Sequence, residues 1–321
     1  MSAIMIEPQT TLESSSPSMS VPPSCGAGDS SPKSLAWWEK TSHEGVYAIV
    51  LARPKEHNAL SKQLLADLES CLDYLAAYRL PEGGDDNEKR APLKAVILRS
   101  SEQGKFCAGA DLKERRTMSE TEVVASLGSL RSVFDKVASF PSPIIAALDG
   151  PTLGGGLELA IACDFRVASE SVAEMLPLSW TNFTQVTELL PGPAAHVPHS
   201  FVLDRQVKRI GFPETGLGII PGAGGTQRAP RLLGLTKAKE LIYTGRLLSA
   251  TEANEWGLVD YLSDEGQDAY QRALKLASFM SNSGESTRKT KRGLPSLTVS
   301  VHTRPSLLLS CQHLWPSPPP S

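Results

Sequence analysis

The pattern of the stretch PIIAALDGPTLGGGLELAIACDFRVAS, residues 143–169, predicts two buried strands with a loop and a helix between them. Residues 143–150 and 163–169 are short apolar runs, which is typical of strands that are buried on both faces. A run of three glycines from Gly154 opens the intervening helix. The same helix carries Glu158 among apolar neighbours, where an ionised carboxylate is costly unless it is paired or protonated.

Similar elements flank this stretch on both sides. Residues 45–53 and 94–100 read as further strands, and residues 61–80 and 123–137 carry apolar side chains at helical spacing. Strands that alternate with helices predict right-handed crossovers and a largely parallel sheet, so the fold class is α/β. Residues 80–92 read as a polar surface loop, and residues 268–280 as the last helix.

Length and composition exclude several classes of protein. A chain of 321 residues with 40% hydrophobic residues can bury one sizeable core. Its net charge of −3 gives no basic field for nucleic acid, and no apolar run is long enough to cross a membrane. Five scattered cysteines form no C-x-x-C pair, and six histidines form no ligand-spaced cluster. We therefore expect no disulfide framework, no metal and a reducing intracellular compartment.

Two loops with small residues follow neighbouring strands. The glycines at the start of the helix leave its unpaired N–H groups accessible to a ligand. In GKFCAGADLKER, residues 104–115, the small residues Ala108, Gly109 and Ala110 lie just before Asp111, which we expect to cap a helix. Two such loops at neighbouring strand ends can direct two N–H groups at one oxygen. This arrangement polarises a carbonyl towards an enolate.

A third glycine-rich segment, GFPETGLGIIPGAGGTQR, covers residues 211–228 and contains Glu214. Together with Glu158, it gives two carboxylates in glycine-lined surroundings, and both could move protons of one water molecule. The chain has neither the G-x-G-x-x-G pattern of dinucleotide sites nor the phosphate-binding G-x-x-x-x-G-K-[ST] pattern.

Four motifs together resemble the enoyl-CoA hydratase/isomerase (crotonase) family: FCAGADLKE, GPTLGGGLELAIACDFRVAS, FPETGLGIIPGAGGTQR and AKELIYTGRLLSATEANEWGLVD. FCAGADLKER followed by MSETEV is similar to the methylglutaconyl-CoA hydratase branch, which is also known for binding AU-rich RNA. The resemblance covers about residues 45–280. It implies a superhelix of repeated ββα units with parallel sheets, trimers or hexamers, and acyl-CoA substrates. It implies no separate cofactor, because coenzyme A is part of the substrate.

The resemblance also assigns roles to residues. The amides of Ala110 and Gly155 would form the oxyanion hole, Glu158 would activate water, and Glu214 would give a proton to the α-carbon. Family isomerases often keep only one of the two acids, so this pair favours a hydratase, with an isomerase as the near alternative. The positions that match substrate-binding residues are Lys55, Ala59, Ala108, Asp111, Leu112, Lys113 and Gly154.

Residues 172–206 interrupt the family pattern. Without them, DFRVASES would run directly into VKRIGFPETGLGIIPG, as it does in the family. The segment begins with Val, whose codons all start with GT, and ends with Gln, one codon of which ends with AG. We therefore expect an unspliced in-frame intron in the gene model. A genuine surface insertion is the alternative, since loops tolerate insertions at low entropic cost.

The remaining expectations concern the ends of the chain and competing functions. We expect a disordered tail over residues 1–36, a catalytic core over residues 37–283, and an atypical tail over residues 284–321 that alters or replaces the family's C-terminal helices. The resemblance implies a mitochondrial protein, but the N-terminal segment is a poor presequence, so a cytoplasmic location is the alternative. RNA binding is a second class of function besides enzyme catalysis, and it is disfavoured because the helix 61–80 lacks a basic face. A catalytically inactive member of the family is the third class of function.

Overall fold

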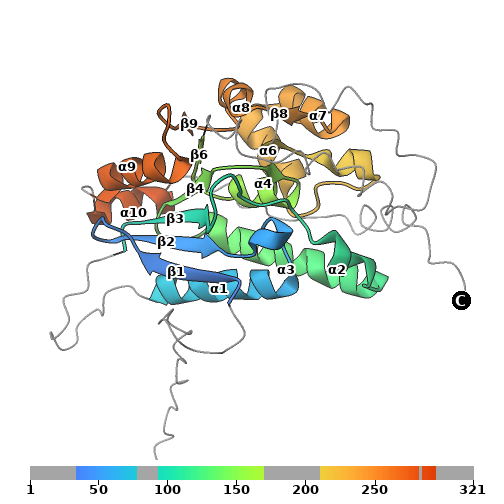
Figure 1. Ribbon diagram of the computed structural model, residues 1–321, viewed down its shortest axis with the longest axis horizontal. Coiled ribbons are helices and arrows are strands. Elements are labelled where there is room, and N and C mark those ends of the chain that lie inside the picture. The colour runs from blue at the N-terminus through green and yellow to red at the C-terminus, as the bar shows by residue number, and fades with distance from the viewer. Residues whose placement is uncertain (1–33, 78–92, 170–209, 282–283, 294–321) are drawn as a thin grey trace, which may run out of the picture.

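The computed structural model describes residues 34–77, 93–169, 210–281 and 284–293, which form two sheets and the helices around them (Figure 1). The larger sheet has the strand order β1-β2-β3-β4-β6-β9. Its strands β1 and β2 are antiparallel, and all other neighbouring pairs are parallel. The six strands are Ala36–Lys40, Val46–Leu51, Ala95–Ser100, Ile144–Leu148, Phe165–Ala168 and Tyr261–Leu262.

The strands and helices expected from the apolar patterns are present. The predicted strands at 45–53, 94–100, 143–150 and 163–169 correspond to β2, β3, β4 and β6. The helix expected in 61–80 is α1 (Lys62–Ala77), and the amphipathic pattern at 123–137 lies in α3 (Glu120–Ala138). The parallel α/β architecture is confirmed.

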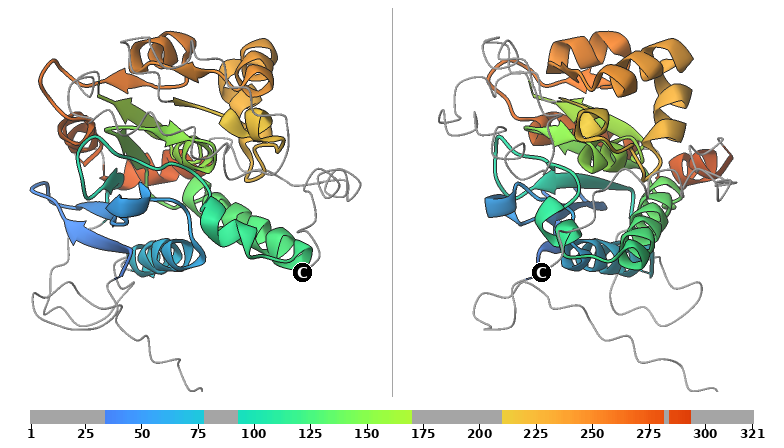
Figure 2. Two further views of the ribbon diagram at one scale, coloured as in Figure 1. Left: turned by 45° about the vertical axis from the view of Figure 1, so that its right-hand side comes forward. Right: turned by 90° about the vertical axis from the view of Figure 1, so that its right-hand side faces the viewer.

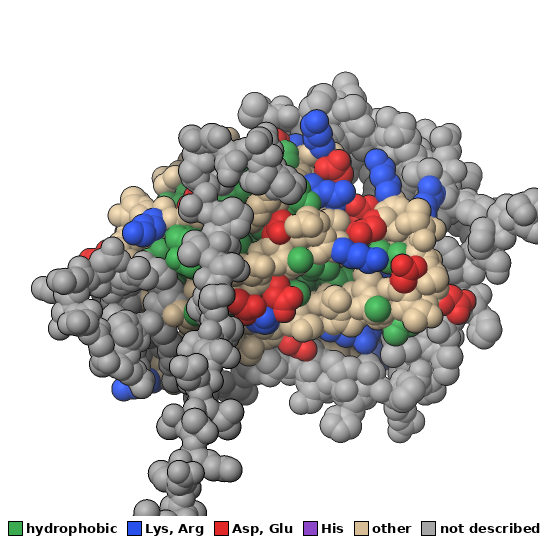
Figure 3. Space-filling model, turned by 90° about the horizontal axis from the view of Figure 1, so that it is seen from below, with side chains coloured by type: hydrophobic (Ala, Val, Ile, Leu, Met, Phe, Trp, Pro, Cys, Tyr) green, Lys and Arg blue, Asp and Glu red, His purple; other side chains and the backbone are tan. Residues whose placement is uncertain are grey.

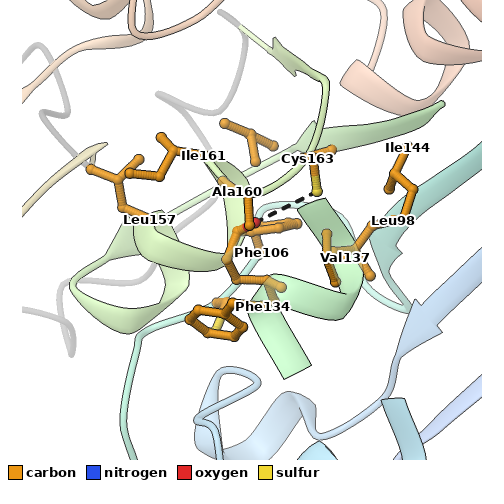
Figure 4. Close-up of a cluster of buried hydrophobic side chains, with 14 of the residues drawn as sticks. Leu98, Phe106, Phe134, Val137, Ile144, Leu157, Ala160, Ile161 and Cys163 are labelled. Atoms are coloured by element: carbon orange, nitrogen blue, oxygen red, sulfur yellow. Dashed lines mark hydrogen bonds between the residues drawn. The ribbon is translucent and has the colours of Figure 1, made fainter. Parts of the chain in front are cut away.

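Each face of the larger sheet has its own apolar cluster. On one face, alternate residues of β3 and β4, such as Leu98 and Ile144, pack with the leucines of α1 and with Phe134 of α3. Figure 4 shows part of this cluster, where Phe106 and Cys163 lie beside α3 and α4. Because successive strand residues point to opposite faces, Ile97 and Ile145 lie in the other cluster.

Helix α9 (Ala269–Ser281) covers this second face and contacts β2, β3, β4 and β6. Its alanines Ala269, Ala273 and Ala277 are fully buried in the second cluster. Asp149, just after β4, holds the start of α9, because its Oδ1 accepts a hydrogen bond of 2.6 Å from the Ala269 amide. Figure 2 shows α9 and α1 on opposite sides of the sheet.

The smaller sheet positions the third glycine-rich segment. It joins β5 (Thr152–Leu153), β7 (Ile210–Gly211) and β8 (Leu247–Leu248) in the order β5-β7-β8. The short elements around it are the helix α4 (Gly155–Ala160), the 3-10 helix η4 (Pro213–Leu217), α6 (Gly225–Leu233), α7 (Leu235–Thr244) and α8 (Ala250–Trp256). Two further short elements are η1 (Pro54–Glu56), which follows β2, and α2 (Leu112–Arg116), which follows the Gly109-containing loop after β3.

Two described elements differ from expectation. Ala36, placed in a disordered tail, begins β1, which pairs with β2 along its length and stacks Trp38 on Tyr74 with ring centroids 4.7 Å apart. Residues 268–280 were expected to be the last helix, but α10 (Gly284–Gly293) follows α9. Its Lys291 Nζ lies 2.5 Å from Asp164 Oδ2 and 3.0 Å from the Ser142 carbonyl, which attaches this basic helix to the sheet.

Several expectations fall outside the described residues: the tail up to residue 33, most of the loop at 80–92, the segment 172–206, and the part of the C-terminal tail after residue 293. Within the described ranges, none of the helices is both long and apolar enough to cross a membrane.

Candidate active site

The loop after β3 lies directly against the loop after β4. The Cys107 amide donates to the Pro151 carbonyl at 3.0 Å, and the Leu153 amide donates to the Cys107 carbonyl at 3.1 Å. Gly109 makes this approach possible, because a Cβ on it would lie 2.7 Å from the Leu153 carbonyl oxygen and 3.2 Å from the Gly155 amide nitrogen. A larger residue could not occupy that position without moving one of the loops.

The contact between the loops brings the amides of Ala110 and Gly155 together. A Cβ on Gly155 would lie 3.4 Å from the Ala110 nitrogen. Gly155 is the first residue of α4, so its N–H has no acceptor within that helix. Neither amide has a backbone acceptor among the described residues. Two neighbouring donors without acceptors can hold one oxygen on which negative charge develops.

Glu158 lies in α4 with only 3% of its surface exposed. Its Oε1 accepts hydrogen bonds from the amides of Ala223, at 2.8 Å, and Gly225, at 2.7 Å. Burial raises the pKa of Glu158 to about 7, although these two hydrogen bonds act in the opposite direction by stabilising the carboxylate. The carboxylate is thus buried and paired with main-chain donors.

Glu214 lies in η4 and has a different environment. It is 7% exposed, and its Oε2 has no hydrogen-bond partner among the described residues. Its Oε1 lies 2.7 Å from the position that a Cβ on Gly154 would take. Burial, and then the charge of nearby Glu158, raise the pKa of Glu214 to about 8. The two carboxylates therefore share one region, where Glu214 favours the protonated form and Glu158 has donors for the ionised form.

The other predicted residues occupy several settings. Lys55 in η1 and Lys113 in α2 are exposed, whereas Ala59, Ala108 and Leu112 are half-buried and Gly154 is buried beneath Glu214.

Asp111 caps α2, as predicted. Its Oδ1 accepts from the amides of Lys113 and Glu114, at 3.0 and 3.1 Å, and its Oδ2 pairs with Arg53 Nη1 at 2.6 Å. Burial acts to raise the pKa of Asp111, but these hydrogen bonds and the guanidinium charge hold it below its ordinary value. The side chain of Asp111 is therefore engaged within the protein.

Comparison with known proteins decides which family this site belongs to. A family model described as enoyl-CoA hydratase/isomerase matches residues 41–182 and 199–296. The chain belongs to the enoyl-CoA hydratase/isomerase family. The break in the match, from residue 183 to 198, falls inside the segment 172–206 that interrupts the sequence motifs.

The relatives of this chain within the family include proteins named as hydratases and one named as an isomerase/hydratase. The chain is 45% identical to the enoyl-CoA isomerase/hydratase fer4 of Mycosarcoma maydis over 68% of this chain and 65% of that protein. It is 38% identical to the mitochondrial methylglutaconyl-CoA hydratase of Mus musculus over 73% of this chain and 60% of that protein. The chain thus spans less than two thirds of the length of these relatives.

A solved structure shows the same fold. The enoyl-CoA hydratase of Bacillus anthracis is 32% identical and superposes with a TM-score of 0.62, covering 87% of this chain and 88% of that one. The expected crotonase-like fold is therefore confirmed.

The role of the loop 222–225 was not anticipated from the sequence. The amides of Ala223 and Gly225 hold Glu158, and Gly225 lacks a side chain where a Cβ would lie 2.9 Å from Glu158 Oε1. The signal was present in the glycines of PGAGGTQR, which the sequence analysis takes only as part of a glycine-rich segment around Glu214. The described residues contain no group of three or more His, Cys, Asp or Glu side chains that could hold a metal ion.

Proposed function

We propose that this chain adds water across the double bond of a 2-enoyl-CoA thioester. The observation that carries the proposal is the pairing of two buried carboxylates in unlike environments with two neighbouring amides that have no backbone acceptor among the described residues. This combination matches the chemistry of a conjugated thioester, which needs an oxygen-binding site, a base and an acid.

The amides of Ala110 and Gly155 would bind the thioester oxygen. As a nucleophile adds to the β-carbon, charge moves to that oxygen and the thioester takes on enolate character. Donors fixed in the backbone stabilise such charge without reorganising during the reaction.

Glu158 and Glu214 would divide the proton transfers. Glu158 as carboxylate takes a proton from water, and the water oxygen forms a bond to the β-carbon while the double-bond electrons move towards the thioester. Protonated Glu214 then gives its proton to the α-carbon, so the product gains the hydroxyl of water and one proton. The proton that Glu158 took from water is afterwards released and Glu214 is protonated again, so one water is added in total and both groups return to their starting states. The donors to Glu158 and the lack of a hydrogen-bond partner for Glu214 Oε2 among the described residues support this division.

Coenzyme A would bind along the loop after β3. Lys55 and Lys113 are exposed cations on η1 and α2, and Ala59, Ala108 and Leu112 are half-buried beside them in the chain. These residues would meet the phosphates and the adenine of the substrate, and Gly154 would let the thioester approach the site.

The resemblance to methylglutaconyl-CoA hydratases supports a 3-methylglutaconyl-CoA-like substrate of leucine degradation, and a mitochondrial location is proposed on the same ground. The 38% identical relative from Mus musculus is named as a mitochondrial methylglutaconyl-CoA hydratase. We also propose a homotrimer or homohexamer. Exposed apolar side chains on α7 and α9, such as Tyr243 and Phe279, support this assembly.

We do not extend the proposal to RNA. On the face of α1, Lys136 of α3 pairs with Glu69 and Asp73, both at 2.8 Å. Figure 3 shows acidic and basic side chains interspersed on the face seen from below. A surface that follows a phosphate backbone presents its cations without acidic partners.

The experiment is to follow the absorbance of the conjugated thioester with crotonyl-CoA and with 3-methylglutaconyl-CoA. General acid–base catalysis contributes about 100-fold to 10,000-fold, so we expect Glu158→Gln and Glu214→Gln each to lose at least about 100-fold in kcat. Glu255→Gln, an exposed glutamate on α8, is the matched control and should keep its activity. Full activity in both Glu158→Gln and Glu214→Gln would contradict the assignment of these two residues as the catalytic pair.

The same variants separate hydration from isomerisation. A 3-enoyl-CoA substrate gains conjugated absorbance when the double bond moves, and this shift needs one acid–base group and no water. An isomerase would keep this reaction in one of the two variants, whereas a hydratase would show crotonyl-CoA hydration that both substitutions abolish.

A further inference from the structure

We propose that Arg131 of α3 and Arg228 of α6 are positioning residues that hold the loop 222–225 in the geometry that orients Glu158. Both act through main-chain atoms of the loop and not by touching substrate. The role of Glu158 as a base rests on the proposed function, but the geometry of the loop does not.

Arg131 reaches Glu158 through a single peptide group. Its Nε donates to the Gly222 carbonyl at 2.7 Å, and the N–H of that same peptide, on Ala223, donates to Glu158 Oε1 at 2.8 Å. Hydrogen bonds in a chain polarise one another, so a guanidinium on the carbonyl strengthens the N–H as a donor. Arg131 therefore fixes both the orientation and the strength of this donor.

Arg228 fixes the next peptide of the loop. Its Nη1 donates to the Ala223 carbonyl at 3.0 Å, and its Nη2 pairs with Asp135 Oδ1 at 2.5 Å. Arg228 is only 1% exposed, so its charge would be costly without these partners. Asp135 and Arg131 are four residues apart on α3 and thus lie on one side of that helix.

The two guanidinium groups also act on the charge of Glu158. Burial is the largest influence and raises its pKa, whereas the hydrogen bonds from Gly225 and Ala223 and the charges of Arg228 and Arg131 act to lower it. Three further charged groups on the packed elements act on this site. Glu214 of η4, when ionised, opposes ionisation of Glu158, Asp135 partly neutralises Arg228, and the charge of Arg231 on α6 acts to lower the pKa of Arg228. Loss of either arginine should therefore favour the protonated form of Glu158.

Arg131→Gln and Arg131→Lys test the peptide relay, and Arg228→Lys tests the buried pair. Arg166→Lys is the matched control. Arg166 is a buried arginine on β6 that also donates to carbonyls, of Leu258 at 2.8 Å and Cys163 at 3.1 Å, and pairs with Asp260. Among the described residues, none of its hydrogen bonds or ion pairs involves the loop 222–225. Circular dichroism and thermal unfolding establish that each variant is folded.

The main readout is the titration of the Glu158 carboxyl group by infrared spectroscopy, assigned by its loss in Glu158→Gln. Arg131→Gln removes the guanidinium charge and its hydrogen bond to the loop. The midpoint of the Glu158 titration should therefore rise by about one pH unit. Near pH 7 we expect about ten-fold lower kcat for crotonyl-CoA with KM changed less than about two-fold, because misorientation of a catalytic group affects the chemical step. Arg131→Lys should recover part of the shift, and Arg166→Lys should show none.

The outcomes separate this proposal from the proposed function. If the wild-type chain does not hydrate crotonyl-CoA but the midpoint of Glu158 moves in Arg131→Gln, the positioning role stands and the proposed function fails. If folded Arg131→Gln leaves the midpoint and the pH profile of kcat unchanged, the positioning role is overturned. Arg228→Lys should also raise the midpoint of Glu158, and a folded Arg228→Lys that leaves it unchanged overturns the role of Arg228. If Arg228→Lys does not fold, Asp135→Asn, which removes the charge paired with Arg228, tests the same role.

Discussion

Glu214 places its carboxylate beside Gly154, in the space where any other residue would carry its Cβ atom. Oε1 lies 2.7 Å from that position, and Gly154 has φ 50° and ψ −121°, a conformation that residues with side chains rarely adopt. The glycine thus provides both the room for the acid and the turn that starts α4.

Gly154→Ala should therefore damage both stability and activity. We expect a loss of about 1–3 kcal/mol in the free energy of unfolding, from backbone strain, and a large loss of kcat because Glu214 is displaced. Urea unfolding and the crotonyl-CoA assay measure the two effects. Gly128→Ala is the control, because a Cβ there would meet no atom within 4 Å from the rest of the described chain outside its own stretch of α3, and it should be neutral or stabilising. Unchanged activity in Gly154→Ala would contradict this placement of Glu214.

The activity should have a narrow bell-shaped pH profile. Glu158 must be ionised, which favours pH values above about 7, and Glu214 must be protonated, which favours values below about 8. The apparent pKa values belong to the coupled pair and not to single residues. Measurement of kcat/KM from pH 5.5 to 9.5 tests this, and a flat profile over that range would exclude the proposed division of roles.

The site should weaken the fold as pH rises. Glu158 and Glu214 have folded-state pKa values above the ordinary value of 4.5, so the folded protein binds more protons than the unfolded chain between pH 4.5 and about 8. Their contribution to stability is thus greatest at low pH and decreases as the groups ionise. Glu214→Gln should be more stable than the wild type at pH 9, by on the order of 1–3 kcal/mol, and no more stable at pH 5.

Urea unfolding of the wild type, Glu214→Gln and the exposed-site control Glu255→Gln at both pH values provides the measurement. A stabilisation by Glu214→Gln that is equal at pH 5 and pH 9 would show that ionisation of Glu214 is not its cause.

The transcript should lack the codons for residues 172–206. The family match is broken at residues 183–198, inside this segment. Without residues 172–206, DFRVASES would continue directly into VKRIGFPETGLGIIPG, which resembles the family pattern. Sequencing of messenger RNA across the junction tests the expectation. A message that consistently contains the segment would instead support a genuine insertion.

Much of the larger sheet could be predicted because its strands are buried on both faces. Apolar runs such as residues 143–150 have no other stable location, and their alternation with helices leaves few topologies. The strand β1 was missed because AWWEK is half-exposed at the edge of the sheet, where one face is covered by α1. The strands of the smaller sheet have two residues each, which is too short for a periodic pattern.

The site residues were reached by motif, but the reason that Glu158 can be buried was not. Its donors are amides of Ala223 and Gly225, which lie far from it in sequence and have no side-chain signature. Any residue has an N–H, so only the folded chain reveals which ones are directed at a carboxylate. The same holds for Arg131, whose effect passes through a peptide group.

Because α9 follows the strands that it covers, the second face of the sheet stays uncovered for part of translation. The strands β2, β3, β4 and β6 are synthesised first, and the helix that covers their second face begins about a hundred residues after β6, or about 65 residues after it if residues 172–206 are not translated. At the usual rate of synthesis this interval corresponds to roughly 3–20 seconds on a ribosome. Throughout that interval the nascent chain carries an uncovered apolar face and an Asp149 without its Ala269 partner. A chaperone that binds nascent chains could therefore bind this apolar face of the sheet until α9 is synthesised and covers it.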